Sequence, residues 1–113
     1  LVNPDTARDF VYVEDICEAF VRAAEHRDGE PGAVYNVGSG MQMTLRDVVE
    51  IAREVLPVAG EPAWNTMPGR SWDTQQWRAD SRKIKESLGW EPRCSFAEGL
   101  RRTVEWCKDF DTS

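Results

Sequence analysis

The stretch RDFVYVED, residues 8–15, carries the strongest local signal in the sequence. An arginine and an aspartate begin it, four consecutive apolar or aromatic residues follow, and two acids end it. A run of β-branched and aromatic residues without polar alternation is typical of a strand that is covered on both faces. We therefore expect residues 10–13 to form a short buried strand, with Arg8 at one end and Asp15 at the other.

Hydrophobic periodicity predicts four helices in the rest of the chain. Each expected helix begins at a side chain that can accept a hydrogen bond from the first turn, and three of these have an acid three residues later. The expected helix starts are Asp15 (with Glu18), Thr44 (with Asp47), Asp80 and Ser95 (with Glu98). Gly89 is the expected end of the third helix. The side chains expected to be buried include Ile16, Ala19, Phe20, Ala23, Leu45, Val48, Ile51, Ala52, Val55, Leu56, Ile84, Leu88, Phe96, Leu100, Val104 and Cys107.

Two further extended segments are predicted, at residues 33–37 and, more weakly, at 63–67. The first ends in Gly-Ser-Gly at residues 38–40, which turns the chain. With 113 residues the chain is long enough for one compact domain. The predicted fold class is α/β: a small mixed domain of about four helices with two or three short strands, over residues 1–113.

Composition excludes several classes of function. No apolar run approaches the roughly twenty residues that a membrane helix needs. A net charge of −6, with basic residues spread along the chain, disfavours nucleic-acid binding. Three cysteines without a Cys-x-x-Cys pair support neither a disulfide framework nor a zinc site, so we expect a cytoplasmic protein without a metal. The chain begins at Leu1 without a signal peptide, and we expect it to be a piece of something longer.

The motifs of a reaction centre are missing from the sequence. The Gly-Ser-Gly turn at residues 38–40 is followed by Met43 at the position where the third glycine of a dinucleotide-binding turn would stand. The residues four positions after Tyr12 and Tyr35 are Ile16 and Ser39, so neither tyrosine begins a Tyr-x-x-x-Lys motif. We therefore expect binding groups but neither catalytic nor cofactor-binding residues in this chain.

Several motifs resemble, in order, the C-terminal region of the extended short-chain dehydrogenase/reductase family, the nucleotide-sugar epimerases and 4,6-dehydratases. They lie at residues 8–15, 35–40, 70–73, 80, 88–90 and 92. The resemblance implies a substrate-binding, C-terminal domain over residues 1–113. It also implies that the family's Rossmann domain, with NAD or NADP and the Tyr-x-x-x-Lys pair, is absent from this chain.

Carried over by position, the resemblance implies three substrate-binding residues. Arg8 and Arg70 match arginines that contact the diphosphate of the substrate, and Asp73 matches an acid that reaches the ribose. Planar guanidinium groups suit a diphosphate because they donate paired, charge-assisted hydrogen bonds. Trp72 stands where many relatives have glycine.

Structural alternatives stay open at each of these positions. Arg8 can pair with Asp9, and Arg70 with Asp73, as ordinary ion pairs. The tryptophans of the loop, Trp64, Trp72 and Trp77, are more typical of packing residues than of ligand platforms.

Two functions from different classes follow. The first is the nucleoside diphosphate sugar-binding portion of an NAD-dependent nucleotide-sugar epimerase or 4,6-dehydratase, inactive by itself. The second is a non-catalytic protein-association module derived from that fold. The expected partners are a nucleotide sugar and either the Rossmann domain or a second copy of the chain.

Overall fold

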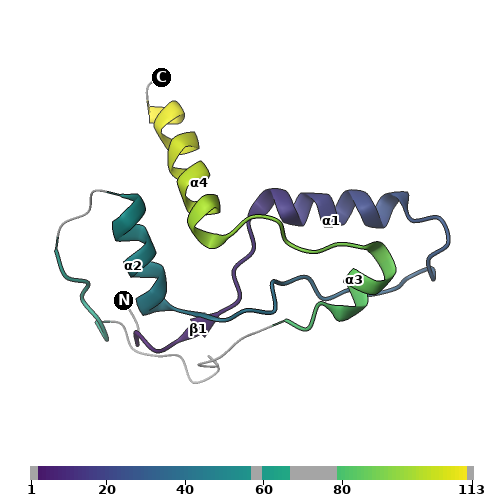
Figure 1. Ribbon diagram of the computed structural model, residues 1–113, viewed down its shortest axis with the longest axis horizontal. Coiled ribbons are helices and arrows are strands. Elements are labelled where there is room, and N and C mark those ends of the chain that lie inside the picture. The colour runs from purple at the N-terminus through teal and green to yellow at the C-terminus, as the bar shows by residue number, and fades with distance from the viewer. Residues whose placement is uncertain (1–2, 57–59, 67–78, 112–113) are drawn as a thin grey trace.

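The computed structural model describes residues 3–56, 60–66 and 79–111, and these contain four helices and one two-stranded sheet. The bounds are β1 Ala7–Arg8, α1 Val13–Glu25, β2 Met43–Thr44, α2 Leu45–Val55, α3 Arg82–Leu88 and α4 Phe96–Asp111. Figure 1 shows α2 and α4 at one end of the molecule and α1 with α3 at the other, joined by extended chain. Within the described residues the expected numbers of helices and strands are confirmed.

The positions of the predicted strands are wrong. The sheet is an antiparallel pair of two-residue strands, with Ala7 opposite Thr44 and Arg8 opposite Met43. Residues 10–12 and 33–37 belong to no strand, and a turn occupies residues 64 and 65. A strand requires a hydrogen-bonding neighbour, and the described residues offer none beside these apolar runs. Met67, the last residue of the weakest prediction, lies outside the described residues.

The helix starts are partly confirmed. Thr44 caps α2 in a full capping box with Asp47, as the sequence predicts. Ser95 Oγ accepts the N–H of Glu98 at the start of α4. Ser81 rather than Asp80 is the N-cap residue of α3, a shift of one residue, and Gly89 ends that helix at φ 65°. At the C-terminal side of a helix this left-handed conformation favours glycine.

The prediction that Asp15 caps its helix is wrong. Tyr12 is the N-cap residue of α1, which begins at Val13. Asp15 lies buried in the first turn, where its carboxylate accepts the N–H of Cys94 at 3.0 Å. The carbonyl of Asp15 accepts the indole N–H of Trp90 at 2.8 Å. Asp15 therefore joins α1 to the chain before α4, and this tertiary contact takes the carboxylate away from a capping role.

The core of the described chain is small and lies between α1 and α3. Ala19, Ile84 and Trp90 are buried and pack together, with partly buried side chains around them. On α1 the predicted buried stripe is only partly covered, because Phe20 is 72% exposed. The helix that contacts α1, α3, has only seven residues. Cys107 on α4, also expected inside, is exposed as well.

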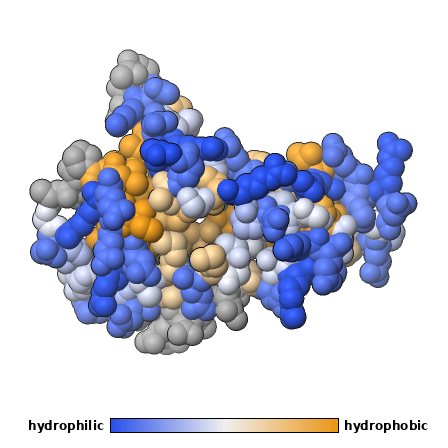
Figure 2. Space-filling view, in the orientation of Figure 1, coloured by the Kyte–Doolittle hydropathy of each residue, from blue (hydrophilic) through white to orange (hydrophobic). Residues whose placement is uncertain are grey.

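The molecule is open for its length. Its Cα radius of gyration is 17.0 Å, against about 13 Å for a compact chain of this size. Large apolar side chains stay exposed, among them Val13, Phe20, Val21, Val34, Met41, Trp106 and Phe110. Figure 2 shows apolar patches over the α2 and α4 end and over α1. None of the helices in the described ranges has the length and apolarity to cross a membrane.

Candidate functional site

Arg8 is the second and last residue of β1 in the short sheet. It pairs with Met43 of β2, and its side chain is partly buried. One guanidinium nitrogen, Nη1, donates to the carbonyl of Ala7 at 2.8 Å. The structure therefore places Arg8 on a hydrogen-bonded backbone, which restricts the directions that its long side chain can take.

Arg70 and Asp73 lie outside the described residues, as do Trp72 and Trp77. The predicted convergence of Arg8, Arg70 and Asp73 on one site thus stays a prediction. Trp64 is described and is half-buried in its loop. A partly buried indole in a loop fits the packing role expected for it.

The carboxylate of Asp9, directly after Arg8, is the centre of a hydrogen-bond network that the sequence did not predict. Its Oδ1 accepts the N–H of Ser39 at 2.9 Å and the hydroxyl of Ser39 at 2.5 Å. Its Oδ2 accepts the N–H of Gly40 at 2.9 Å and that of Ala79 at 3.2 Å. One side chain therefore joins the end of β1 to two segments that are 30 and 70 residues away along the chain.

Gly38 allows these segments to approach each other. A Cβ built on Gly38 would lie 2.4 Å from the Cβ of Ala79 and 2.9 Å from Oδ2 of Asp9. Contacts below 3.0 Å require some atom to move, and Ala79 has no flexible side chain with which to yield. Glycine is thus required at position 38 by close packing.

The environment of Asp9 lowers the pKa of its carboxyl below the ordinary value of 3.8. Desolvation is the largest single influence and raises the pKa, but the hydrogen bonds from Ser39, Ala79 and Gly40 together outweigh it. Hydrogen bonds to the charged form stabilise that form. Asp9 is therefore an ionised acceptor whose oxygens are already engaged within the protein.

The same geometry tests whether residues 38–40 can hold the pyrophosphate of NAD. A dinucleotide site offers free backbone N–H groups of a glycine-rich turn at a helix N-terminus. Here the N–H groups of Ser39 and Gly40 point to Asp9, and α2 begins only at Leu45. The described residues at this turn therefore do not fit the cofactor.

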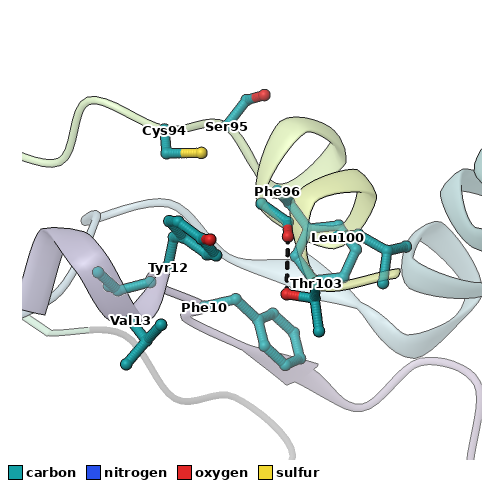
Figure 3. Close-up of a pocket in the computed structure, with 10 residues that line it drawn as sticks. Phe10, Tyr12, Val13, Cys94, Ser95, Phe96, Leu100 and Thr103 are labelled. Atoms are coloured by element: carbon teal, nitrogen blue, oxygen red, sulfur yellow. Dashed lines mark hydrogen bonds between the residues drawn. The ribbon is translucent and has the colours of Figure 1, made fainter. Parts of the chain in front are cut away.

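A hollow of about 380 Å³ lies between the chain before α1 and the start of α4. Figure 3 shows Phe10, Tyr12 and Val13 on one side and Phe96, Leu100 and Thr103 of α4 on the other. The rings of Phe10 and Phe96 are tilted, with centroids 5.3 Å apart. Because no Asp, Glu, Lys or Arg side chain is among the residues that line it, this hollow suits an apolar group better than a phosphate.

A second hollow of about 280 Å³ adjoins the first and shares with it the lining residues Phe10, Cys94, Ser95 and Phe96. Ser39 and Arg93 also line it. Arg93, which is exposed, lies 3.4 Å from the partly buried Glu18 in an ion pair. Among the described residues, no group of three His, Cys, Asp or Glu side chains is placed to hold a metal ion.

Sequence reasoning missed Asp9 as an organising residue. It considered Asp9 only as an ion-pair partner of Arg8. The available signal was the combination of an acid directly before an apolar run with a Gly-Ser-Gly turn, since such turns expose consecutive N–H groups to an anion. What the sequence lacked was any indication that these two segments meet.

Comparison with known proteins identifies the relatives of this chain. The family model described as GDP-mannose 4,6 dehydratase matches residues 1–103. The UDP-glucose 4-epimerase of Mycolicibacterium smegmatis is 34% identical over 102 residues, which are 90% of this chain and 31% of that protein. The dTDP-D-glucose 4,6-dehydratase of Mus musculus is 34% identical over 104 residues, covering 88% of this chain and 28% of that protein.

Solved structures show the same relationship. The crystal structure of UDP-glucose 4-epimerase from Thermotoga maritima with UDP-glucose superposes with a TM-score of 0.83 at 33% identity. The match covers 95% of this chain and 33% of that one. The chain thus spans about a third of the length of the relatives that it matches. It belongs to the GDP-mannose 4,6 dehydratase family, whose members similar to it include nucleotide-sugar epimerases and dehydratases.

Proposed function

We propose that these 113 residues form the C-terminal, substrate-binding portion of an NAD- or NADP-dependent nucleotide-sugar epimerase or 4,6-dehydratase. The observation that carries the proposal is the match of nearly the whole chain to about a third of such enzymes. The sequence contains neither a Tyr-x-x-x-Lys motif nor a dinucleotide-binding turn. Binding of the nucleoside diphosphate is therefore the step assigned to this chain, and catalysis requires groups that its sequence does not contain.

Arg8, Arg70 and Asp73 are the proposed ligands of the substrate. Arg8 is attached to the sheet, so its guanidinium can be presented from a fixed backbone. A charge-assisted hydrogen bond contributes roughly 1.5–3 kcal/mol. In an acidic chain of net charge −6, attraction of a diphosphate depends on such local contacts, because the overall field repels it.

The test is calorimetric titration of the folded chain with UDP, GDP, CDP and dTDP and with their sugars. We expect one nucleotide to bind, and expect Arg8→Ala and Arg70→Ala each to weaken that binding by about tenfold or more. Arg101→Ala is the matched control, because Arg101 lies on the exposed side of α4 beside Glu98. Folded chain that binds none of these compounds at millimolar concentration would refute a preformed substrate site.

A second candidate function is association with another protein, and the exposed apolar side chains favour it. Phe20 and Met41 are each 72% exposed and Val34 is 75% exposed. Apolar surface of this kind favours self-association or a partner domain. Light scattering with and without nucleotide separates the candidates: a stable dimer that ignores nucleotide supports the association module, whereas a monomer that binds nucleotide supports the substrate domain.

A further inference from the structure

We propose that Asp9 is a positioning residue for Arg8: by holding the backbone at the end of β1, it sets the direction in which the guanidinium is presented to a nucleoside diphosphate. This inference rests on the proposed function of Arg8. Asp9 touches no substrate in this scheme. It acts through the four hydrogen bonds that its carboxylate accepts from Ser39, Gly40 and Ala79.

Side chains alternate between the two faces of an extended segment. Arg8 is the last residue of β1, and continuation of its extended backbone would place Arg8 and Phe10 on the face opposite the carboxylate of Asp9. On one side Asp9 is bound to the turn at residues 38–40 and to Ala79. On the other side Phe10 packs against Phe96 of α4. The backbone beside Arg8 is therefore held from both faces, and rotation about it is restricted.

The sheet alone would hold this segment weakly. β1 has only two residues, and its antiparallel pairing with β2 runs from Ala7 opposite Thr44 to Arg8 opposite Met43, the first residue of β2. The ladder thus stops at Arg8 itself. The next residue along the chain is Asp9. Beyond the ladder, the hydrogen bonds of its side chain to Ser39, Gly40 and Ala79 hold this segment in place.

Electrostatics favours the same arrangement. A free carboxylate beside a diphosphate would repel it, because like charges at short distance destabilise each other. Here the charge of Asp9 is engaged by four N–H or O–H donors from Ser39, Gly40 and Ala79, and these donors stabilise it within the protein. The pair Arg8 and Asp9 can thus present a cation on one side while its anion is satisfied on the other.

The decisive experiment is a double-mutant cycle on nucleotide affinity, with Arg8→Lys, Asp9→Asn and both together, at a temperature where circular dichroism shows every variant to be folded. Asparagine keeps the size of the side chain but replaces one acceptor oxygen with a donor, which faces N–H groups. We expect Asp9→Asn alone to weaken binding of the nucleotide by about tenfold. Because Asp9 acts through Arg8, we expect it to add little in the Arg8→Lys background.

Asp15→Asn is the matched control. Asp15 also accepts a backbone N–H, that of Cys94, and its loss also removes a tertiary hydrogen bond. It lies in the first turn of α1 and takes no part in the sheet. If Asp9 positions Arg8, Asp15→Asn lowers the melting temperature without changing affinity, whereas Asp9→Asn changes both.

Two results would overturn the inference while leaving the proposed function intact. One is nucleotide affinity unchanged in Asp9→Asn, and the other is losses from Arg8→Lys and Asp9→Asn that multiply independently. A folded wild-type chain that binds no nucleotide would instead refute the proposed function, and the positioning role with it.

Discussion

Replacement of Gly38 by alanine tests the close approach on which the network around Asp9 depends. The new Cβ would lie 2.4 Å from the Cβ of Ala79 and 2.9 Å from Oδ2 of Asp9. Gly38 does not have a positive φ angle, so alanine meets no backbone strain there and the cost of the substitution is steric. Overpacking of this kind typically costs about 1–3 kcal/mol. Because two contacts fall below 3.0 Å, we expect about 2–3 kcal/mol and a melting temperature lower by roughly 10 °C or more.

The assay is thermal and urea unfolding followed by circular dichroism. Gly40→Ala is the control in the same turn: its Cβ would meet nothing within 4 Å, but φ is 76°. Its cost should be about 1–2 kcal/mol and purely conformational. Removing the opposing methyl group with Ala79→Gly should recover part of the stability lost in Gly38→Ala, but none of that lost in Gly40→Ala. A Gly38→Ala variant as stable as wild type, or one that Ala79→Gly does not improve, would refute the steric account.

The remaining predictions concern the core and the ionisation of Asp9. Trp90→Phe should destabilise the chain by about 1–3 kcal/mol in urea unfolding, because Trp90 is 1% exposed and its indole N–H binds the carbonyl of Asp15. Trp106→Phe, at 61% exposed, should change stability by less than about 0.5 kcal/mol, and equal effects would contradict the assigned core. Since the pKa of Asp9 is lowered on folding, its ionised form stabilises the fold above the unfolded pKa, and that contribution is lost as pH falls through the folded value. The stability difference between wild type and Asp9→Asn should therefore be constant near neutral pH and shrink below 3.8, and a difference that grows on acidification would contradict this.

The features that could be predicted from the sequence depend on neighbours along the chain. The capping box of Thr44 and Asp47 joins residues three apart, and it is formed as expected. Gly89 ends α3 because a left-handed residue is needed there, a requirement that is local as well. Helix periodicity likewise involves only one or two turns of chain.

The features that were predicted wrongly depend on partners far away in the sequence. Residues 10–13 and 33–37 have strand-like composition, but a strand forms only beside another strand, and in the described chain the pairing goes to Ala7 and Arg8. Periodicity predicts that Phe20 lies on the buried face of its helix, but no described element covers it. Burial is decided by what packs on a face rather than by the pattern of the face.

The sequence by itself determined the helices, the acidic character, the absence of a cofactor-binding turn, and the motifs that identify Arg8, Arg70 and Asp73 as candidate ligands. Only the tertiary structure decided the role of the residue next to Arg8. The carboxylate of Asp9 gains its function from Ser39, Gly40 and Ala79, which are brought to it by folding across 30 to 70 residues. The stretch RDFVYVED, residues 8–15, is therefore a segment held by its side chains rather than a strand. The sequence did not reveal this, because hydrogen bonds between distant residues, unlike helical periodicity, leave no regular spacing in a sequence.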